Sequence, residues 1–427
     1  MNNIKEIKNE LLNERYFEID HSSGLKIFVY PKENYSSSYA IFGTKYGSID
    51  NCFKAGENGE YTEVPEGIAH FLEHKLFESE ERDAFTRYAE TGASANAYTS
   101  FDKTCYLFSC SGNFTASLEI LLDFVTSPYF TPETVKKEQG IIGQEIKMTN
   151  DEPGWASLFT LLKAMYKTHP VSIDIAGTVQ SIAEISAELL YECYNAFYNL
   201  NNMALAVAGN ISVREVLTVA DKILKPAKAQ KIERKFEEEP KEVVSKYAEK
   251  HLSVSRPLFA IGYKEDVQGV RRTLKQSMES EIMLDIIAGR TSNVYEQMMD
   301  EGLINTTFNA EYFEGEGFGA HIFSGESENP DEVRKCIDAE ISRLQTEGIS
   351  ADEFERIKKK HYGEFIMGFD DVDAVANYLI GDYFNGNGLF DGLEVLESIT
   401  AEDINRRLRE AIDVNNSSMS VIRRNKK

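Results

Sequence analysis

The sequence predicts an α+β protein whose two domains share one fold. The chain has 427 residues, more than one compact core usually supports, so two domains of roughly 200 residues each are expected. In the first half, segments with the alternating pattern of strands are interspersed with amphipathic helical segments. A passage near the end of each half repeats one helix–strand pattern, which indicates duplicated domains.

The repeated passage is a helix capped by Ser or Thr, followed by a strand with a methionine near its start. In the first half Ser186 caps the helix and Met203 begins the strand. In the second half Thr400 and Met419 take these places at nearly the same separation. Ser and Thr side chains accept hydrogen bonds from the first N–H groups of a helix, so both passages carry a helix start signal.

The domain boundary is predicted just past the middle of the chain. Residues 227–250 are highly charged and poor in apolar side chains, a composition that suits an interdomain linker. A solvated helix would have the same composition, but the position favours the linker. We therefore expect an N-terminal domain at 1–230, a linker at 231–248 and a C-terminal domain at 249–427.

The elements of the first half follow from hydrophobic periodicity and turn-forming residues. Residues 1–18 are polar and predict a short helix or a tail. The later segments predict a strand pair at 22–33 and 36–50, helical structure at 67–88 with a charged break near 78–81, a hairpin at 93–109, and helices at 117–128 and 134–150.

Composition excludes several classes of function. The net charge is −24, and a surface this acidic repels phosphate, so no nucleic-acid partner is expected. The same surface favours basic or neutral substrates, or it serves solubility alone. The N-terminus lacks the apolar core of a signal peptide and no stretch is apolar enough to span a membrane. Five cysteines without a CxxC pair indicate neither a disulfide framework nor a cysteine zinc cluster, so we expect a cytoplasmic protein.

The strongest functional signal is the segment His70-Phe71-Leu72-Glu73-His74, an HxxEH motif. On a helix, residues i and i+4 share one face, so His70 and His74 can bind the same cation. Two histidines and a carboxylate form a typical catalytic zinc set that leaves a position for water. Glu73 is well placed to take the proton of that water as general base.

A third ligand is expected from the predicted helix at 134–150. Glu138 and Glu145 stand two turns apart along one face of this helix. Both can point at a common site, one as metal ligand and the other as hydrogen-bond partner of a histidine. The sequence alone does not rank them, and a solvated helix face would show the same spacing.

HFLEH followed about seventy residues later by this pair of glutamates resembles the M16 peptidases, which are inverzincins. The resemblance implies zinc bound by His70, His74 and Glu145. It gives Glu138 a supporting role and Glu73 the role of general base.

Other segments resemble the same family. Residues 92–99 are similar to its edge strand, to which a peptide adds as an extra β-strand, and this implies substrate contacts at Asn96 and Ala97. An ordinary half-buried strand would show the same pattern. Phe77 resembles a residue of the family's substrate pocket, with a core phenylalanine as the equal alternative. His169 resembles a family landmark, and we expect it to be structural.

The family resemblance also implies the architecture and a partner. It implies two homologous domains, each an antiparallel sheet flanked by helices, and a half-size subfamily in which two chains close into a chamber. Self-sufficient members carry an arginine followed by a tyrosine that hold substrate carbonyls, and these positions align with Met298 and Asn305 here. The departure resembles the zinc-bearing chain of two-subunit bacterial pairs. We therefore expect a homologous partner chain without the zinc motif, with a homodimer as the alternative.

The expected function is that of a zinc-dependent endopeptidase acting on unfolded peptides or the leader segments of precursors. The alternative is a non-catalytic scaffold or assembly subunit of the same fold. The complete set of His70, Glu73, His74 and Glu145 argues against this alternative, because lost catalysis would erode a ligand first. Zinc hydrolysis of a non-peptide substrate is disfavoured by the predicted edge strand.

Overall fold

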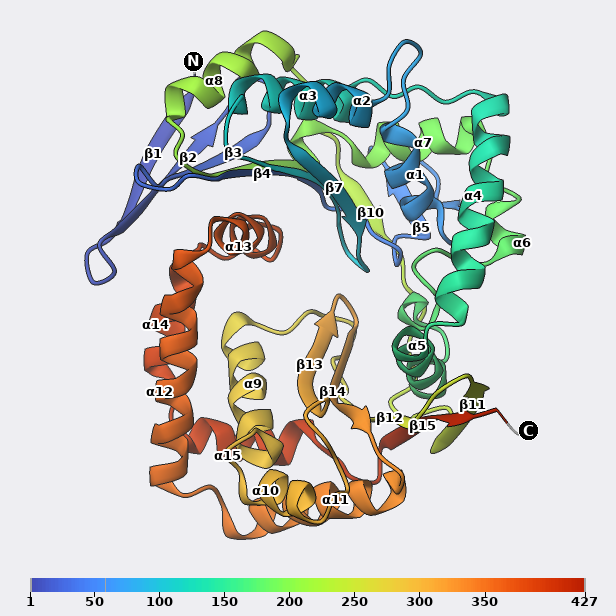
Figure 1. Ribbon diagram of the computed structural model, residues 1–427, viewed down its shortest axis with the longest axis vertical. Helices are drawn as coiled ribbons and strands as arrows, with labels where there is room; N and C mark the ends of the chain where they lie inside the picture. The colour runs from blue at the N-terminus through green and yellow to red at the C-terminus, as the bar shows by residue number, and fades with distance from the viewer. Residues whose placement is uncertain (1, 58, 426–427) are drawn as a thin grey trace. The chain divides into compact units, whose positions relative to one another are not determined.

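The computed structural model describes residues 2–57 and 59–425 (Figure 1). Contacts between Cα atoms group the chain into two compact units, each combining three separate segments. The predicted domains at 1–230 and 249–427 stay a prediction, and the contact grouping differs from them by assigning one segment of each half to the other unit. The first unit contains Met1–Gln144, Asp174–Lys235 and Phe365–Phe390, and the second contains Glu145–Ile173, Phe236–Glu364 and Asp391–Lys427.

The first unit is built on a seven-stranded sheet with the order β1-β2-β3-β9-β4-β8-β7. The β3–β9 pair is parallel and all other neighbours are antiparallel. The strands are β1 (Asn3–Asn9), β2 (Glu14–Asp20), β3 (Lys26–Pro31), β4 (Ser38–Thr44), β7 (Ser94–Thr99), β8 (Thr104–Cys110) and β9 (Met203–Gly209).

The prediction of a helix or tail in residues 1–18 is wrong. β1 and β2 form an antiparallel hairpin in which Asn3 lies opposite Asp20. β2 also pairs with β3, and Tyr16 and Ile19 of β2 are buried. Pairing with strands later in the chain therefore overrides the weak local signal of a polar segment.

The predicted pairing of the strands within 22–33 and 36–50 is also wrong, because β9 lies between β3 and β4. Every residue of β9 is buried, as expected for a central strand covered on both faces. Its partners are more than a hundred residues away in the sequence, so local periodicity could not reveal the insertion.

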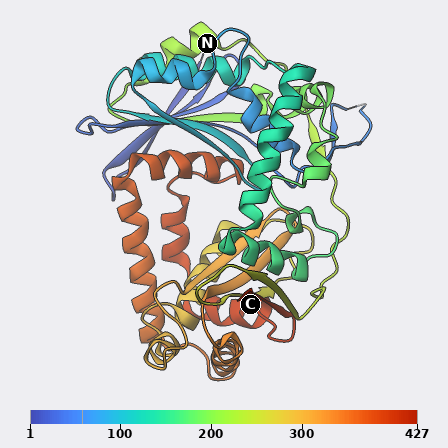
Figure 2. The ribbon, with the colours of Figure 1, turned by 45° about the vertical axis from the view of Figure 1, so that its right-hand side comes forward.

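Helices cover both faces of this sheet (Figures 1 and 2). α1 and α3 pack on one face against β8, and α13 packs on the other face against β4 and β9. The predicted helical region with a charged break, the hairpin at 93–109 and the helices at 117–128 and 134–150 are confirmed. The helices are α1 (Ile68–Leu76), α2 (Ala84–Thr91), α3 (Phe114–Thr126), α4 (Pro132–Asn150), α6 (Val179–Ile182), α7 (Ala187–Phe197), α8 (Val213–Ile223) and α13 (Val372–Phe384).

A small three-stranded sheet joins the predicted linker to the first unit. It has the order β10-β5-β6, with β5 (Cys52–Ala55), β6 (Thr62–Glu63) and β10 (Ile232–Arg234). Arg234 donates a hydrogen bond to the buried Asp50 carboxylate at 2.6 Å. The beginning of the predicted linker is therefore held in place by a strand pair and an ion pair.

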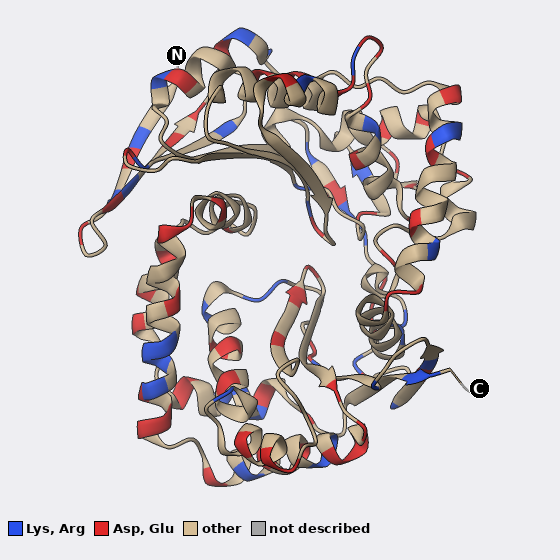
Figure 3. Cartoon of the chain, viewed as in Figure 1, with Lys and Arg blue, Asp and Glu red and all other residues tan. Residues whose placement is uncertain are grey.

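The second unit repeats this design with a five-stranded sheet of order β11-β15-β12-β14-β13. Its strands are β11 (Tyr247–Leu252), β12 (Leu258–Lys264), β13 (Asn309–Gly315), β14 (Phe318–Glu326) and β15 (Ser417–Arg424). Its helices are α5 (Pro153–Met165), α9 (Leu274–Ala288), α10 (Asn293–Asp300), α11 (Pro330–Glu347), α12 (Ala351–Met367), α14 (Asp391–Ser398) and α15 (Ala401–Ala411). Figure 3 shows Asp and Glu on helices of both units, in keeping with the net charge of −24.

The two sheets share one strand order, which confirms the predicted duplication and the predicted α+β fold class. The last strand of each unit, β9 or β15, lies parallel to the strand that begins the shared order, β3 or β11, and antiparallel to the next, β4 or β12. The helix before each last strand has the predicted cap. Ser186 accepts a hydrogen bond from Leu189 N–H, and Thr400 accepts one from Asp403 N–H.

Each unit also receives one helix from the other half of the sequence. α13 lies on the sheet of the first unit and α5 on the sheet of the second. A glycine lies beneath each helix, and an added Cβ would be crowded there. At Gly43 it would lie 3.1 Å from Ile380 of α13, and at Gly262 it would lie 2.5 Å from Met165 of α5. The missing side chains let both helices approach their sheets closely.

In the part of the chain that the structure describes, no helix is both long and apolar enough to cross a membrane. All five cysteines are free thiols.

Candidate metal centre

The HxxEH segment is placed by a close approach at the start of α1. Gly67 caps this helix with a φ of 85°, a left-handed conformation that favours glycine. A Cβ at Gly67 would lie 2.3 Å from the Ala176 carbonyl oxygen, and one at Gly177 would lie 2.5 Å from the Glu66 carbonyl oxygen. The two glycines therefore let the loop at 176–177 pack directly against the beginning of α1.

One side of α1 belongs to the core of the first unit. Ile68, Phe71, Leu72 and Leu76 are all buried, and α1 contacts β7 and β8. The apolar side fixes the helix on the sheet, while the two histidines lie on the half-buried remainder of its surface.

The structure brings His70, His74 and Glu145 together. One ligand atom from each residue lies within 4.8 Å of the other two, and all three residues are half-buried. The imidazole centroids are 4.7 Å apart, as expected for residues one turn apart on a helix. Two imidazole nitrogens and one carboxylate oxygen are the donor set of a catalytic zinc site, so these residues fit zinc.

Glu138 takes a different place from Glu145 on the same helix, α4. Its Oε1 lies 3.0 Å from His74 Nδ1. Because a carboxylate accepts, this contact places the proton on Nδ1, which leaves Nε2 of His74 as the nitrogen that could bind a cation. The two glutamates that the sequence alone could not rank are thus distinguished by their contacts, one at the imidazole and one in the ligand group.

Glu73 lies on the buried side of the motif and is 9% exposed. Its Oε2 accepts a hydrogen bond of 2.6 Å from Thr99 Oγ1, at the end of β7. Sequence reasoning missed Thr99 although it lies in the segment compared with the edge strand. The signal available was a hydroxyl residue at the end of that strand, which by itself does not reveal a partner on α1.

A buried tyrosine pair lies near the Glu73 carboxylate. The hydroxyls of Tyr106 and Tyr198 are 2.8 Å apart. Burial, with a further contribution from the Glu73 charge, raises the pKa of both phenols well above their usual range. Both tyrosines therefore stay protonated and neutral beside the carboxylate.

The expected substrate strand, β7, is the last strand of its sheet and pairs only with β8 among the described strands. Asn96 is exposed on this strand, and its side-chain oxygen accepts a hydrogen bond from the Ala97 N–H at 2.9 Å. The outer edge of β7 thus presents main-chain groups of the kind that pair with an added strand.

Phe77 lies within an aromatic stack. It is 9% exposed and stacks on Phe85 at 4.4 Å and on Phe124 at 5.0 Å between ring centroids. Phe85, in contrast, is 53% exposed. Phe77 is therefore largely a core residue, and Phe85 is the part of the stack that solvent reaches.

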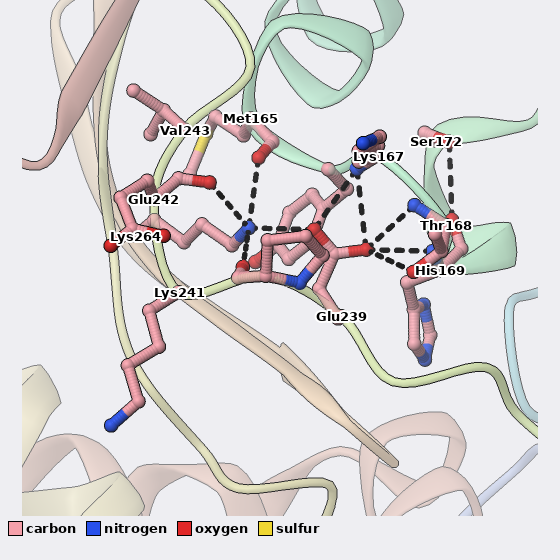
Figure 4. A network of polar contacts seen from close by, with 12 residues as sticks. Met165, Lys167, Thr168, His169, Ser172, Glu239, Lys241, Glu242, Val243 and Lys264 are labelled. Carbon is pink, nitrogen blue, oxygen red and sulfur yellow. Dashed lines mark hydrogen bonds and ion pairs between the residues drawn. The ribbon is translucent and has the colours of Figure 1, made fainter.

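His169 is structural, as predicted. Its Nδ1 accepts a hydrogen bond from Val171 N–H, and its Nε2 donates to the Glu316 carbonyl oxygen at 3.0 Å. Burial lowers the pKa of His169 to about 4, so the imidazole stays neutral. The Glu239 carboxylate accepts hydrogen bonds from the backbone N–H groups of residues 167–169 and forms an ion pair with Lys264, as Figure 4 shows.

The side chains at the two positions that align with the family's carbonyl-binding arginine and tyrosine are engaged by neighbours within the second unit. Met298 is fully buried in its hydrophobic core. The Asn305 side chain donates to Glu326 at 2.8 Å and accepts from Thr307 N–H at 2.9 Å. Neither side chain has the charge or the reach of an arginine.

Comparisons with known proteins point to one peptidase family. The family described as "Insulinase (Peptidase family M16)" matches residues 48–179, and "Peptidase M16 inactive domain" matches residues 184–360. A relative from Bacillus subtilis, named "Uncharacterized zinc protease YmfH", is 40% identical over 414 residues, and the match covers 96% of each chain. A solved structure titled a putative M16-like peptidase, from Alicyclobacillus acidocaldarius, is 34% identical with a TM-score of 0.91 over 99% of both chains. Pitrilysin, at 16% identity, shares the fold with a TM-score of 0.77, over 98% of this chain and 46% of its own.

Proposed function

Because the chain belongs to peptidase family M16, we propose that it is a zinc-dependent endopeptidase acting on unfolded peptides or precursor leader segments. The observation that carries the proposal is the grouping of ligand atoms from His70, His74 and Glu145 within 4.8 Å. Glu73, on the same turn of helix as His74, supplies the general base.

Zinc held by these three residues would polarise the scissile carbonyl and lower the pKa of water in the site. The Glu73 carboxylate accepts a proton from the attacking water and later delivers it to the leaving amine nitrogen. Glu138 holds the His74 imidazole in the tautomer that offers Nε2.

The substrate is an extended peptide that adds to the free edge of β7. Main-chain hydrogen bonds would bind it with little dependence on side chains, and a folded protein offers no such strand. Asn96 and Ala97 lie on this edge, while Phe85 presents an apolar surface beside Phe77. These features support an unfolded-peptide substrate over a small molecule.

A homologous chain without the zinc motif is the proposed partner. The support comes from the clamp positions, because Met298 is buried and Asn305 is bonded to its own neighbours. The partner would close a chamber with this chain and supply the missing contacts to substrate carbonyls. Five free cysteines support a reducing, cytoplasmic setting.

The test is cleavage of an unstructured fluorogenic peptide by the purified chain, alone and with the candidate partner. We expect zinc at one per chain and weak cleavage alone. Adding the partner should raise the rate about 30- to 1000-fold, since two hydrogen bonds to substrate contribute roughly 2–4 kcal/mol in the transition state. A chelator should abolish cleavage.

Two outcomes would contradict the proposal. Full activity of the chain alone, unchanged by the partner, would refute the heterodimer. A chain that binds no zinc and cleaves nothing in either state would favour the non-catalytic scaffold of the same fold.

A further inference from the structure

Glu73 has two carboxylate oxygens, and the proposed reaction uses one of them to accept the proton of water. We propose that Thr99 is a positioning residue that holds Oε2 of Glu73 and so selects Oε1 as the proton acceptor. This inference rests on the proposed function and adds to it a residue from a second structural element, β7.

The contact between the two side chains has the geometry of a strong hydrogen bond. Thr99 Oγ1 lies 2.6 Å from Glu73 Oε2, within the range of a hydroxyl that donates to a carboxylate. Glu73 is 9% exposed, so little water is present to replace this donor. A carboxylate held at one oxygen loses the rotation that would otherwise exchange its two oxygens.

The Thr99 hydroxyl has two neighbouring oxygen atoms, and the one that takes its proton is on Glu73. Thr99 pairs with Thr104 across the hairpin, and their Oγ1 atoms lie 3.4 Å apart. Thr104 is fully buried and donates its own proton to the Tyr46 carbonyl oxygen at 2.9 Å. A carboxylate can only accept, and its contact with Thr99 is much shorter than the contact between the two threonines, so Thr99 donates to Glu73.

The turn that follows Thr99 is fixed by main-chain hydrogen bonds. Ser48 N–H donates to the Ser100 carbonyl and Ile49 N–H donates to the Phe101 carbonyl, at 3.0 and 3.1 Å. At Gly47 an added Cβ would lie 2.3 Å from the Phe101 carbonyl oxygen, so these two loops are in direct contact. The strand end that carries Thr99 is therefore fixed against the loop at 47–49, and β7 itself contacts α1.

The inference predicts an effect on turnover and not on binding. Thr99→Val removes the hydroxyl at nearly constant volume and should lower kcat about 10- to 100-fold, the usual range for groups that orient a reacting residue. KM should stay within about twofold, because Thr99 acts on Glu73 and not on the peptide. Thr99→Ser keeps the hydroxyl and should restore kcat to within a few-fold of the original.

The matched control is Thr62→Val. Thr62 Oγ1 donates to Glu192 at 2.9 Å, so this change removes a threonine–glutamate hydrogen bond between β6 and α7 in the same unit, without touching Glu73. It should leave kcat unchanged. In addition, Thr99→Val should cause no further loss in a Glu73→Gln background, because the two residues act as one unit.

Crystal structures of Thr99→Val and Thr99→Ser give a readout that needs no activity. The Glu73 carboxylate should keep its position in the serine variant and leave it in the valine variant, with melting temperatures unchanged in both. An unmoved Glu73 in Thr99→Val, an impaired Thr99→Ser, or equal losses with and without Glu73 would overturn the inference. A wild-type chain that cleaves no peptide would instead contradict the proposed function, while the crystal structures would still test Thr99.

Discussion

The two units of the molecule use one strand order but treat the same pair of helices differently. In the first half of the sequence, α1 and α4 carry two histidines and two glutamates, with His74 in contact with Glu138 and the candidate ligand atoms of His70, His74 and Glu145 grouped. In the second unit, the corresponding helices by chain order are α9 and α12. There Asp285 accepts from His361 at 3.0 Å and from Lys360 at 2.5 Å.

The difference shows how a duplicated scaffold separates chemistry from stability. Lys360, beside the Asp285 carboxylate, supplies positive charge on α12. On α1 and α4, a bound metal ion would supply it. Among the described residues, the one group of three ligand atoms close enough to share a metal ion lies on α1 and α4, and α9 and α12 carry no such group. One helix pair thus groups the candidate metal ligands, and its counterpart is linked by ion pairs.

Loss of a ligand gives the largest expected difference between the units. His74→Ala leaves two protein ligands and should abolish stoichiometric zinc at neutral pH. His361→Ala, in the second unit, should leave the zinc content at one per chain. Metal analysis of the two purified variants measures this contrast. One zinc per chain in His74→Ala would show that His74 is not a zinc ligand.

Loss of the general base should spare the metal. Glu73→Gln keeps the shape of the side chain but cannot take a proton, so we expect a rate loss of about 10² to 10⁴ with zinc and fold retained. Glu281→Gln, on α9 of the second unit, is the matched change and should have little effect on rate. Peptide cleavage by the assembled enzyme measures both, and activity within a few-fold after Glu73→Gln would show that another residue is the base.

Loss of the Glu138 carboxylate, which contacts His74, should reduce activity less than loss of the Glu73 carboxylate. Glu138→Gln keeps an acceptor oxygen near His74 Nδ1 but removes the charge, so activity or zinc affinity should fall about 10- to 100-fold. A competition titration with a zinc chelator measures the affinity. An effect as large as that of Glu145→Gln would mean that the two glutamates share the ligand role.

The ion pairs of the second unit should affect stability alone. Burial by itself would raise the pKa of Asp285, but hydrogen bonds from His361 and Lys360 lower it below its ordinary value of 3.8. The folded state therefore gains stability from ionised Asp285 above that value and loses it as pH falls through the lowered pKa. Asp285→Asn should reduce the free energy of unfolding by about 1 kcal/mol near neutral pH, because Lys360 is partly exposed.

Urea unfolding at neutral pH and at an acidic pH measures that contribution, since the difference between the two proteins should shrink as Asp285 becomes protonated. Zinc content should not change in this variant. An equal loss at both pH values would mean that packing, and not the charge of Asp285, links α9 to α12.

The parts of the site that sequence could predict are those fixed by local geometry. HxxEH sets its own spacing on α1, and the interval from Glu138 to Glu145 does the same on α4. Thr99 was missed because its contact with Glu73 joins a strand end to a helix, and no local period encodes that. The catalytic roles of these residues stay predictions.

The fold follows the same division. Helices with a clear apolar face and the β7–β8 hairpin were predicted, since their hydrogen bonds close within short segments. The insertion of β9, the hairpin at residues 3–20 and the exchange of α5 and α13 depend on contacts between distant segments. Such contacts depend on how a whole helix packs on the face of a sheet. In the sequence, only the glycines at 43 and 262 hint at this close packing.

The exchanged helices have a consequence for the synthesis of the chain. Once the ribosome has synthesised the chain through residue 209, the sequences of all seven strands of the first sheet have been made. The apolar face that includes Ala204, Ala206 and Ala208 stays uncovered until α13, which begins at Val372, has been synthesised. The nascent first unit therefore carries an uncovered sheet until nearly the whole protein has been made, a state in which a chaperone would bind it. A fragment ending at the predicted linker would keep that bare face permanently and should aggregate.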